Sequence, residues 1–462
     1  MSNFIRLRKG LNIPLMGEAI TKVTKSITSG IVAVKPTDFK SLNPKLLVKE
    51  GDPVKAGSPV LVDKKYPSVN FCSPVSGTVK EIVRGDKRKL LEVRIETDGK
   101  NEYLEFPVPD IKNAKREELI KLLLDGGLWP ALKQRPYGTT PNPEMVPKAI
   151  FISGFDTAPL APDTTFTLKD SIDDIQKGVD VFNKLTLGGV HMSLHSGNHA
   201  GNSLHKLNNV ISHVFDGPHP AGNVGVHIHH ISPINKGDIV WTIDVYSLAA
   251  VGRLFSKGVY DTRKIIAVTG PRALNPSYIE VVPGISFKNI AEYADTECIN
   301  RKGLTEKALD IRYISGNILT GDNVGADGFL GFFHNQITLI SEGNYYEMFG
   351  WVKPFRLKKF SVSHTYFSWL LPKKKYNMDS NLNGGRRPFV VTGLYEKVLP
   401  MDIHPMFLFK ACLAGEIENM ETLGIYEVIE EDVALCEYVC PSKTEIQEII
   451  SDGINLMIKE MS

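Results

Sequence analysis

The stretch VKEGDPVKAGSPVLVDKKYPSVNFCSPVSGTV, residues 48–79, consists of short apolar runs separated by glycine and proline. The pattern continues to about residue 106 and includes Leu91, Val93 and Ile95, which alternate with polar or charged neighbours. Alternation with a period of two is typical of half-buried strands, and Gly and Pro mark the turns between them. We therefore predict an all-β sandwich or barrel over residues 1–106.

This β module resembles the domain that carries lipoate or biotin on a lysine arm. In that fold the modified lysine lies eight residues before the proline of an A-P-x-x-G turn; here the turn is SPVSG, residues 73–77, and Tyr66 occupies the lysine position. A shift of one residue turns a side chain to the other face of a strand, so we expect an unmodified structural copy of the carrier. Attachment at Lys65, which lies close by with Lys64, is the alternative.

The chain has 462 residues, more than one hydrophobic core usually spans, so about three or four domains are expected. A net charge of +2, with 42% hydrophobic and 23% charged residues, is typical of a globular protein and argues against a nucleic-acid binder. No apolar run reaches the ~18 residues of a membrane span, and the N-terminus lacks an apolar signal core, so we expect a cytoplasmic protein. The five cysteines are Cys72, Cys298, Cys412, Cys436 and Cys440. Their odd number and scattered positions favour free thiols in a reducing compartment over a disulfide framework.

Three further sections follow the β module. Residues 107–258 alternate strand and helix patterns, which predicts a small doubly wound, Rossmann-like α/β domain. Residues 259–352 return to short strands with Gly-Pro and Asn-Pro turns and fit an α+β domain. Residues 353–462 contain a basic, proline-containing linker at 371–375. Near their end, isoleucines recur at the three- and four-residue spacing of one helix face, which predicts a C-terminal helical region.

Five longer stretches carry a family resemblance that covers nearly the whole chain. They are RLRKGLNIPL (6–15), GLWPALKQRPY (127–137), GPHPAGNVGVHIHHISPI (217–234), VTGPRALNPSYIEVVPG (268–284) and CPSKTEIQEIISDGI (440–454). Together with the order of the four sections, they resemble the family of A subunits of bacterial sodium-translocating NADH:quinone reductases. A more distant similarity links the chain to the NADH-binding flavoprotein subunit of respiratory complex I and to the C subunit of the Rnf complex.

The resemblance implies a lipoyl/biotinyl-like barrel-sandwich module, a Rossmann-like domain, a β-grasp-like (SLBB) domain and a helical region. It also implies a peripheral subunit on the cytoplasmic side of the bacterial inner membrane, bound to the integral membrane subunits of a six-subunit complex. That complex couples NADH oxidation and ubiquinone reduction to Na⁺ export, and its FAD, FMN, riboflavin and iron-sulfur carriers would lie on other subunits. The alternative is a soluble flavin-dependent NADH dehydrogenase-like protein.

The residues themselves argue against a cofactor in this chain. Where the complex I relative has a glycine-dense loop for the flavin phosphate, residues 126–135 read GGLWPALKQR, and the tryptophan, proline and leucine side chains would crowd a phosphate out. The first α/β strand is not followed by G-x-G-x-x-G. Cys436 and Cys440 lack the C-x2-C-x2-C spacing of a four-iron cluster. We expect no flavin, no cluster and no direct NADH oxidation here.

Histidines and acidic residues form two dense groups. Nine of the twelve histidines are His191, His195, His199, His205, His213, His219, His227, His229 and His230. Because no ligand spacing such as H-E-x-x-H accompanies them, we favour structural or interfacial roles over a metal site, with proton handling or quinone contact as the alternative. The acidic group Glu427, Glu430, Glu431 and Asp432 is interpreted as a solvated face or docking surface. No catalytic residue is predicted.

The segment 129–137 is the one predicted small-molecule contact. Trp129, Lys133, Arg135 and Tyr137 offer an indole, an amine, a guanidinium and a phenol, which could stack on and hydrogen-bond a quinone ring. The family resemblance favours quinone binding by this subunit. The alternative is that the Trp-Pro loop is a wedge between domains, because aromatic residues and arginine also mark protein interfaces.

Overall fold

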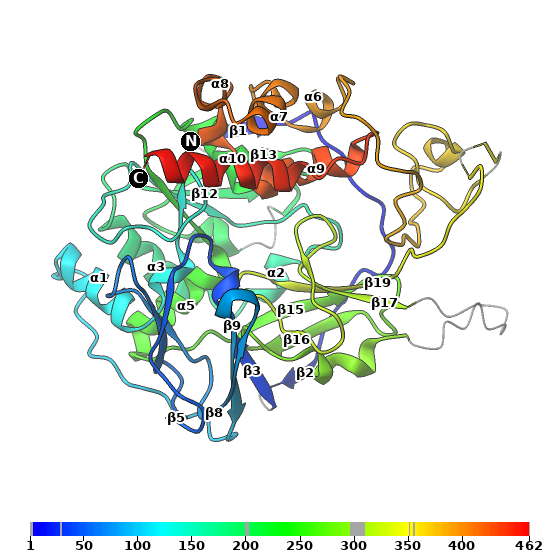
Figure 1. The fold of residues 1–462 in the computed structure, drawn as a ribbon. Coiled ribbons are helices and arrows are strands. Elements are labelled where there is room, and N and C mark those ends of the chain that lie inside the picture. The colour runs from blue at the N-terminus through cyan, green and yellow to red at the C-terminus, as the bar shows by residue number, and fades with distance from the viewer. Residues whose placement is uncertain are drawn as a thin grey trace.

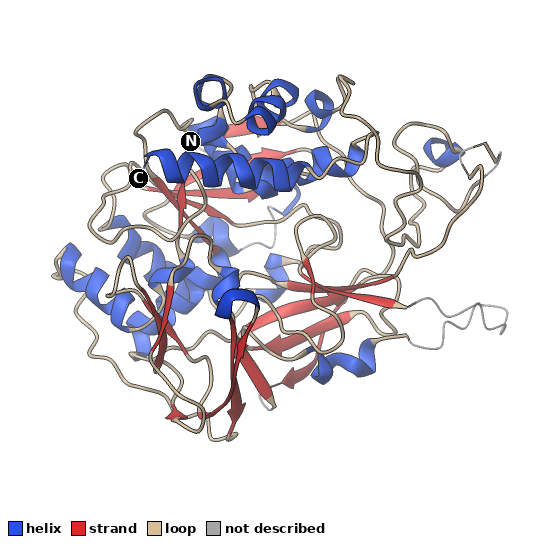
Figure 2. Cartoon of the chain, in the orientation of Figure 1, coloured by secondary structure: helices blue, strands red, loops and turns tan. Residues whose placement is uncertain are grey.

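The computed structural model describes residues 3–27, 30–198, 203–295, 310–350, 352–353 and 356–461. Two six-stranded sheets, a β module of two smaller sheets and a set of C-terminal helices make up the molecule (Figures 1 and 2). His199 and Cys298, both considered above, lie outside the described residues.

The predicted β module is confirmed for residues 31–97. One sheet has the order β3-β9-β8-β5 and the other β4-β6-β7. The first contains β3 (Ile31–Val34), β9 (Leu90–Thr97), β8 (Gly77–Arg84) and β5 (Pro53–Val54). The second contains β4 (Pro44–Leu46), β6 (Pro59–Asp63) and β7 (Asn70–Cys72). Val93 and Ile95 of β9 are buried and Glu96 is exposed, as their alternation predicts.

The α/β section contains a mostly parallel sheet of order β1-β13-β12-β11-β14-β10. Its strands are β1 (Asn3–Arg6), β13 (Ile211–Asp216), β12 (Val190–His195), β11 (Ile150–Ser153), β14 (Val240–Asp244) and β10 (Lys133–Arg135). Only β10 runs antiparallel to its neighbour. β11 is buried on both faces, which is usual for a parallel strand covered by helices on each side.

Two packed helices cover one face of this sheet, α3 (Ile172–Asn183) and α5 (Val245–Lys257). α5 begins where the Asp244 carboxylate accepts hydrogen bonds from the backbone N–H groups of Tyr246 and Ser247. It ends at Gly258, whose φ of +68° is the left-handed conformation that glycine adopts at helix ends. Shorter helices in this section are α1 (Arg116–Asp125), α2 (Thr164–Thr167) and α4 (Val224–Ile231).

The C-terminal helices pack on the opposite face of the same sheet (Figure 1). They are α6 (Tyr395–Val398), α7 (Pro405–Ala414), α8 (Ile417–Thr422), α9 (Glu430–Val439) and α10 (Ile446–Met461). Phe151 of β11 shares their hydrophobic cluster, whereas its neighbours Ile150 and Ile152 point into the cluster around α3 and α5. The predicted C-terminal helices therefore form the third layer of the α/β section.

The second large sheet has the order β18-β17-β19-β15-β16-β2. Its strands are β18 (Asp322–Asn323), β17 (Ile311–Ser315), β19 (Gln336–Ser341), β15 (Lys264–Thr269), β16 (Ser277–Val281) and β2 (Ile20–Ile27). The chain's first two strands thus lie outside the β module that residues 1–106 were predicted to form: β1 pairs with β13, and β2 pairs with β16. Residues 3–27 thus join both large sheets at their edges.

Candidate functional site

A cavity of about 400 Å³ opens at the carboxyl ends of β11 and β14, where Ser153 and Asp244 line it. β12 and β13 lie on one side of β11, and β14 lies on the other. Open α/β sheets bind ligands in the crevice at such a change of direction. Gln336 of the second sheet and Glu431 of α9 also line the cavity, so three parts of the chain enclose it.

Arg135 lies at one wall of this cavity and is almost completely buried, with 1% of its surface exposed. Its Nη1 donates to Asp432 Oδ2 at 2.6 Å, and its Nη2 donates to Glu431 Oε1 at 2.6 Å. Burial raises the pKa of Asp432, and the two carboxylates raise the pKa of Arg135 against the effect of its own burial. The guanidinium is therefore held by α9, and its two ion pairs connect β10 to the C-terminal helices.

Lys133 is the predicted contact residue best placed for a ligand. It lines the cavity, is half-buried, and its Nζ lies 4.1 Å from the centre of the Phe333 ring. An ammonium group over an aromatic face is attracted to it, yet the group keeps hydrogen-bond donors for a further partner. Lys133 and Arg135 thus border the same cavity.

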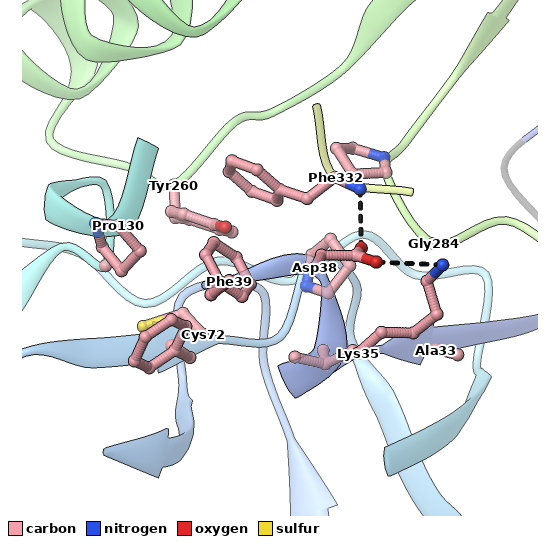
Figure 3. A pocket seen from close by; sticks show the side chains of 14 residues that line it. Ala33, Lys35, Asp38, Phe39, Cys72, Pro130, Tyr260, Gly284 and Phe332 are labelled. Atoms are coloured by element: carbon pink, nitrogen blue, oxygen red, sulfur yellow. Dashed lines mark hydrogen bonds and ion pairs between the residues drawn. The ribbon is translucent and has the colours of Figure 1, made fainter. Parts of the chain in front are cut away.

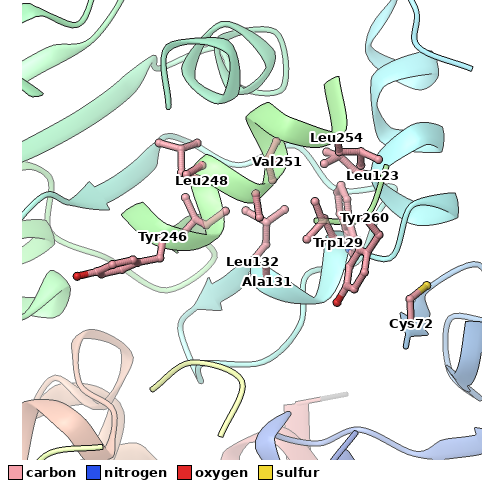
Figure 4. Close-up of a cluster of buried hydrophobic side chains, with 14 of the residues drawn as sticks. Cys72, Leu123, Trp129, Ala131, Leu132, Tyr246, Leu248, Val251, Leu254 and Tyr260 are labelled. Carbon is pink, nitrogen blue, oxygen red and sulfur yellow. The ribbon is translucent and has the colours of Figure 1, made fainter. Parts of the chain in front are cut away.

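Trp129 and Tyr137 do not border it. Trp129 has no exposed surface, donates from Nε1 to the Pro141 carbonyl at 2.9 Å, and packs edge-on against Trp241 with ring centres 5.2 Å apart. Figure 4 shows it among apolar side chains, with Cys72 of the β module nearby. Its position matches the alternative interpretation, a wedge between the β module and the α/β section. Tyr137 lies instead beside Tyr426, 6.2 Å between ring centres.

Asp156 and His219 also line the cavity; His219 belongs to the dense histidine group described above, whereas Asp156 was not predicted as a site residue. Asp156 follows β11, its carboxylate accepts a hydrogen bond from the Ala158 N–H at 2.7 Å, and its deep position raises its pKa. His219 is buried, its Nδ1 lies 3.1 Å from Thr157 Oγ1, and burial lowers its pKa to about 4. Each residue follows the end of a parallel strand, and for Asp156 this position was the available sequence signal.

Other described histidines of the dense group contact protein groups. His191 Nδ1 lies 3.0 Å from His213 Nε2, His227 Nε2 lies 2.7 Å from the Ala221 carbonyl, and His229 Nδ1 lies 2.7 Å from Glu427 Oε2. Burial lowers the pKa of His191 to about 4 and that of His227 to about 3. Among the described residues, no group of three or more histidine, cysteine or acidic side chains is arranged to hold a metal ion.

The described cysteines are free thiols, all of them buried. The Tyr395 hydroxyl donates to Cys440 Sγ at 3.1 Å, and burial raises the pKa of Cys436. Both cysteines belong to the cluster of the C-terminal helices, which agrees with a packing role.

The turn between β6 and β7 carries Lys64 and Lys65, both exposed, and the partly buried Tyr66. A small pocket of about 30 Å³ lies on another side of the β module, beside Phe39 and Cys72. Figure 3 shows the buried pair at its edge: Asp38 accepts a hydrogen bond from the Phe332 N–H at 2.8 Å and pairs with Lys35 Nζ at 3.0 Å. That pocket has room for about one water molecule.

Comparison with known proteins places the chain in a family. The descriptions "NqrA N-terminal barrel-sandwich hybrid domain" and "NqrA second alpha/beta domain" match residues 5–98 and 114–260. The A subunit of the Na(+)-translocating NADH-quinone reductase of Neisseria meningitidis serogroup B is 36% identical over 462 residues, covering 99% of this chain and all of the relative. The chain belongs to this A-subunit family.

A second member of the A-subunit family, from Hahella chejuensis, is 35% identical over 459 residues, again covering 99% of this chain and all of the relative. An NAD+-reducing [NiFe]-hydrogenase in its air-oxidised state is 13% identical, with a TM-score of 0.32, over 51% of this chain and 48% of that one. No conclusion about this chain rests on so distant a similarity.

Within the described part of the chain, no helix has the length and apolar character needed to cross a membrane.

Proposed function

We propose that the chain is the peripheral A subunit of a sodium-pumping NADH:quinone oxidoreductase. The observation that carries this proposal is the full-length similarity to relatives that bear this name. In the proposed complex, NADH oxidation and ubiquinone reduction drive Na⁺ export, and FAD, FMN, riboflavin and iron-sulfur carriers belong to other subunits. The chain lies on the cytoplasmic side of the inner membrane, attached to the integral membrane subunits. The comparisons do not favour the alternative of a soluble flavin-dependent dehydrogenase.

The proposal assigns the α/β section to a Rossmann-like fold and the second large sheet to a β-grasp-like (SLBB) domain. It also places a quinone contact at the cavity beside Lys133. The Lys133 ammonium would donate to a quinone carbonyl, and Phe155 and Phe333 supply apolar wall. Asp156 lines the same cavity, and its burial raises its pKa above the usual range. Arg135 holds the wall in place.

The test compares the membrane complex purified from a strain that lacks this chain with the complex restored by adding the chain. The restored complex is expected to reduce ubiquinone with NADH in a Na⁺-stimulated reaction. Without the chain, ubiquinone reduction is expected to fall while electron transfer from NADH to ferricyanide continues, because the carriers are assigned to other subunits. Full quinone reduction without the chain, or loss of the ferricyanide reaction, would contradict the proposal.

A further inference from the structure

The chain between β19 and α6, here called the segment 343–393, is described at residues 343–350, 352–353 and 356–393, and these residues extend away from both large sheets, at the right of Figure 1. Its only helix or strand in the described part of the chain is a 3₁₀ helix, Phe367–Leu370. Large apolar side chains are unusually exposed here: eleven of the twenty-five found on the described residues lie in these 51 positions. Tyr346 is 92% exposed, Phe349 60% and Trp369 52%. Apolar exposure concentrated in one stretch of chain is typical of a surface that contacts a partner.

The segment is also strongly basic. It contains nine lysines and arginines but only two acidic residues, a net charge of +7. Because the chain as a whole carries +2, the remaining residues carry −5. The basic residues include the runs 358–359, 373–375 and 386–387. The excess positive charge therefore lies in the same stretch of chain as the exposed apolar side chains.

Contacts within the segment give it a defined shape. The Arg356 guanidinium pairs with Glu347 and lies 5.3 Å from the centre of the Tyr366 ring. The Tyr366 hydroxyl donates to the Gly350 carbonyl at 3.1 Å, which holds the 3₁₀ helix beside the turn at 347–350. The other acidic residue, Asp379, accepts a hydrogen bond from Tyr345 at 2.6 Å. Both acidic side chains are thus used inside the segment.

Several of the basic groups remain available. Lys358, Lys373 and Arg387 are exposed, and none forms an ion pair with a described residue. Exposed cations and exposed Trp and Leu side chains in one stretch of chain match the interface of a lipid bilayer, where basic groups meet anionic headgroups and tryptophan lies at headgroup depth. A protein partner fits less well, because lysine is depleted at protein interfaces.

We propose that the segment 343–393 binds directly to a bilayer that carries anionic lipids. Trp369 and Leu370 on the 3₁₀ helix enter the interface, and the lysine runs meet the headgroups. This contact adds to the proposed attachment through integral membrane subunits. The inference rests on the proposed position of the chain beside a membrane, but lipid alone suffices to test it.

The experiment is co-sedimentation of the full purified chain with vesicles of phosphatidylcholine alone and of phosphatidylcholine with about one third phosphatidylglycerol. The chain is expected to bind the anionic vesicles, to bind neutral vesicles more weakly, and to dissociate as salt rises. Lys358→Gln with Lys373→Gln is expected to weaken binding by about fivefold per charge. Trp369→Ser with Leu370→Ser is expected to weaken it by at least about tenfold, through lost apolar burial.

The matched controls are Leu187→Ser, a side chain 96% exposed before β12, and Lys177→Gln on α3; both are expected to bind like the parent. Thermal unfolding confirms that each variant is folded. Absence of binding by the folded parent, or equal binding by parent and variants, would overturn the inference. Loss of assembly with the membrane subunits in the same variants, without any vesicle binding, would overturn it in favour of a protein partner. Neither result depends on quinone reductase activity, so the proposed function stands or falls separately.

Discussion

Arg135 and Asp432 are 297 residues apart in the sequence and form a buried ion pair, with 2.6 Å between Nη1 and Oδ2. Neither side chain has more than 1% of its surface exposed. The pair joins the edge strand β10 to helix α9 and thus connects the sheet of the α/β section to its layer of C-terminal helices. Removing one partner of a buried ion pair destabilises the folded protein, because the other charge is left buried without compensation.

Arg135→Met is therefore expected to lower the free energy of unfolding by about 3–5 kcal/mol, because it leaves two carboxylates without their cation. Urea unfolding followed by circular dichroism measures the loss. The double variant Arg135→Met with Asp432→Leu is expected to recover most of it. Arg386→Gln removes an exposed pair with Glu445 and serves as the control, with an expected cost below about 1 kcal/mol. A small effect of Arg135→Met would show that the pair does not join the two layers.

Stability is expected to depend on His227 below pH 6.5. The folded state keeps this imidazole neutral down to a pKa of about 3, whereas the unfolded chain takes up the proton near pH 6.5. The unfolded state thus binds more protons, so this contribution to stability falls as the pH falls from 6.5 toward 3. Between pH 7 and pH 5, the parent is expected to lose about 2 kcal/mol more than His227→Gln.

Urea titrations of both proteins at each pH measure this difference. The comparison between parent and variant is needed because buried carboxyl groups with raised pKa, such as Asp38 and Asp156, act in the opposite direction. Equal losses in the two proteins would mean that His227 gains a proton without unfolding.

Lys133→Ala is expected to weaken binding of a short-chain ubiquinone by about tenfold or more, because a hydrogen bond from a charged donor is lost. Equilibrium binding to the purified complex measures it. Lys148→Ala is the control, since this ammonium pairs with Asp238 at the surface, 3.0 Å away. If Lys133→Ala binds the quinone with the affinity of the parent, Lys133 does not contact the quinone and the proposed site in this cavity is wrong.

Trp129→Phe is expected to act on stability and to leave quinone affinity unchanged. The change removes the hydrogen bond to the Pro141 carbonyl in a buried place, at a cost of about 1–3 kcal/mol. Thermal unfolding and quinone binding are measured on the same preparation. Trp369→Phe, at an exposed position, is the control, with an expected change within about 0.5 kcal/mol. Weaker quinone binding by a stable Trp129→Phe protein would restore the stacking interpretation.

Lys65 is expected to stay unmodified. Although exposed at the β6–β7 turn, it lies one residue before the position that aligns with the lysine of a carrier domain. Intact mass spectrometry after co-expression with lipoyl and biotin ligases is expected to give only the 51.2 kDa chain. An added mass that disappears in Lys65→Arg and persists in Lys64→Arg would show that the module is a carrier.

The main strands and helices of the α/β section were predictable because their sequence signals are strong, such as the continuous apolar run of β11 and the helical apolar spacing of α3. The positions of β1 and β2 were not predictable, since their partners lie about 200 residues or more further along the chain. Periodicity shows which face of a strand is buried, but it does not identify the neighbouring strand.

The candidate site was predicted only in part. Lys133 and Arg135 border the cavity, whereas Trp129 is enclosed in the core. A Trp-Pro segment has the same composition in a binding loop and in a wedge, so only its packing distinguishes them. Asp156 belongs to no motif, and the fold of the α/β section brings it to the same cavity as His219.

The pairing of β1 with β13 has a consequence for synthesis on the ribosome. Asn3 leaves the ribosome first, but its partner His213 follows 210 residues later. At translation rates of 5–20 residues per second, β1 waits roughly 10–40 seconds for its partner. During that interval the backbone groups of the N-terminal strand lack their native partner, and we expect nascent chains to be most exposed to pairing with one another at this stage.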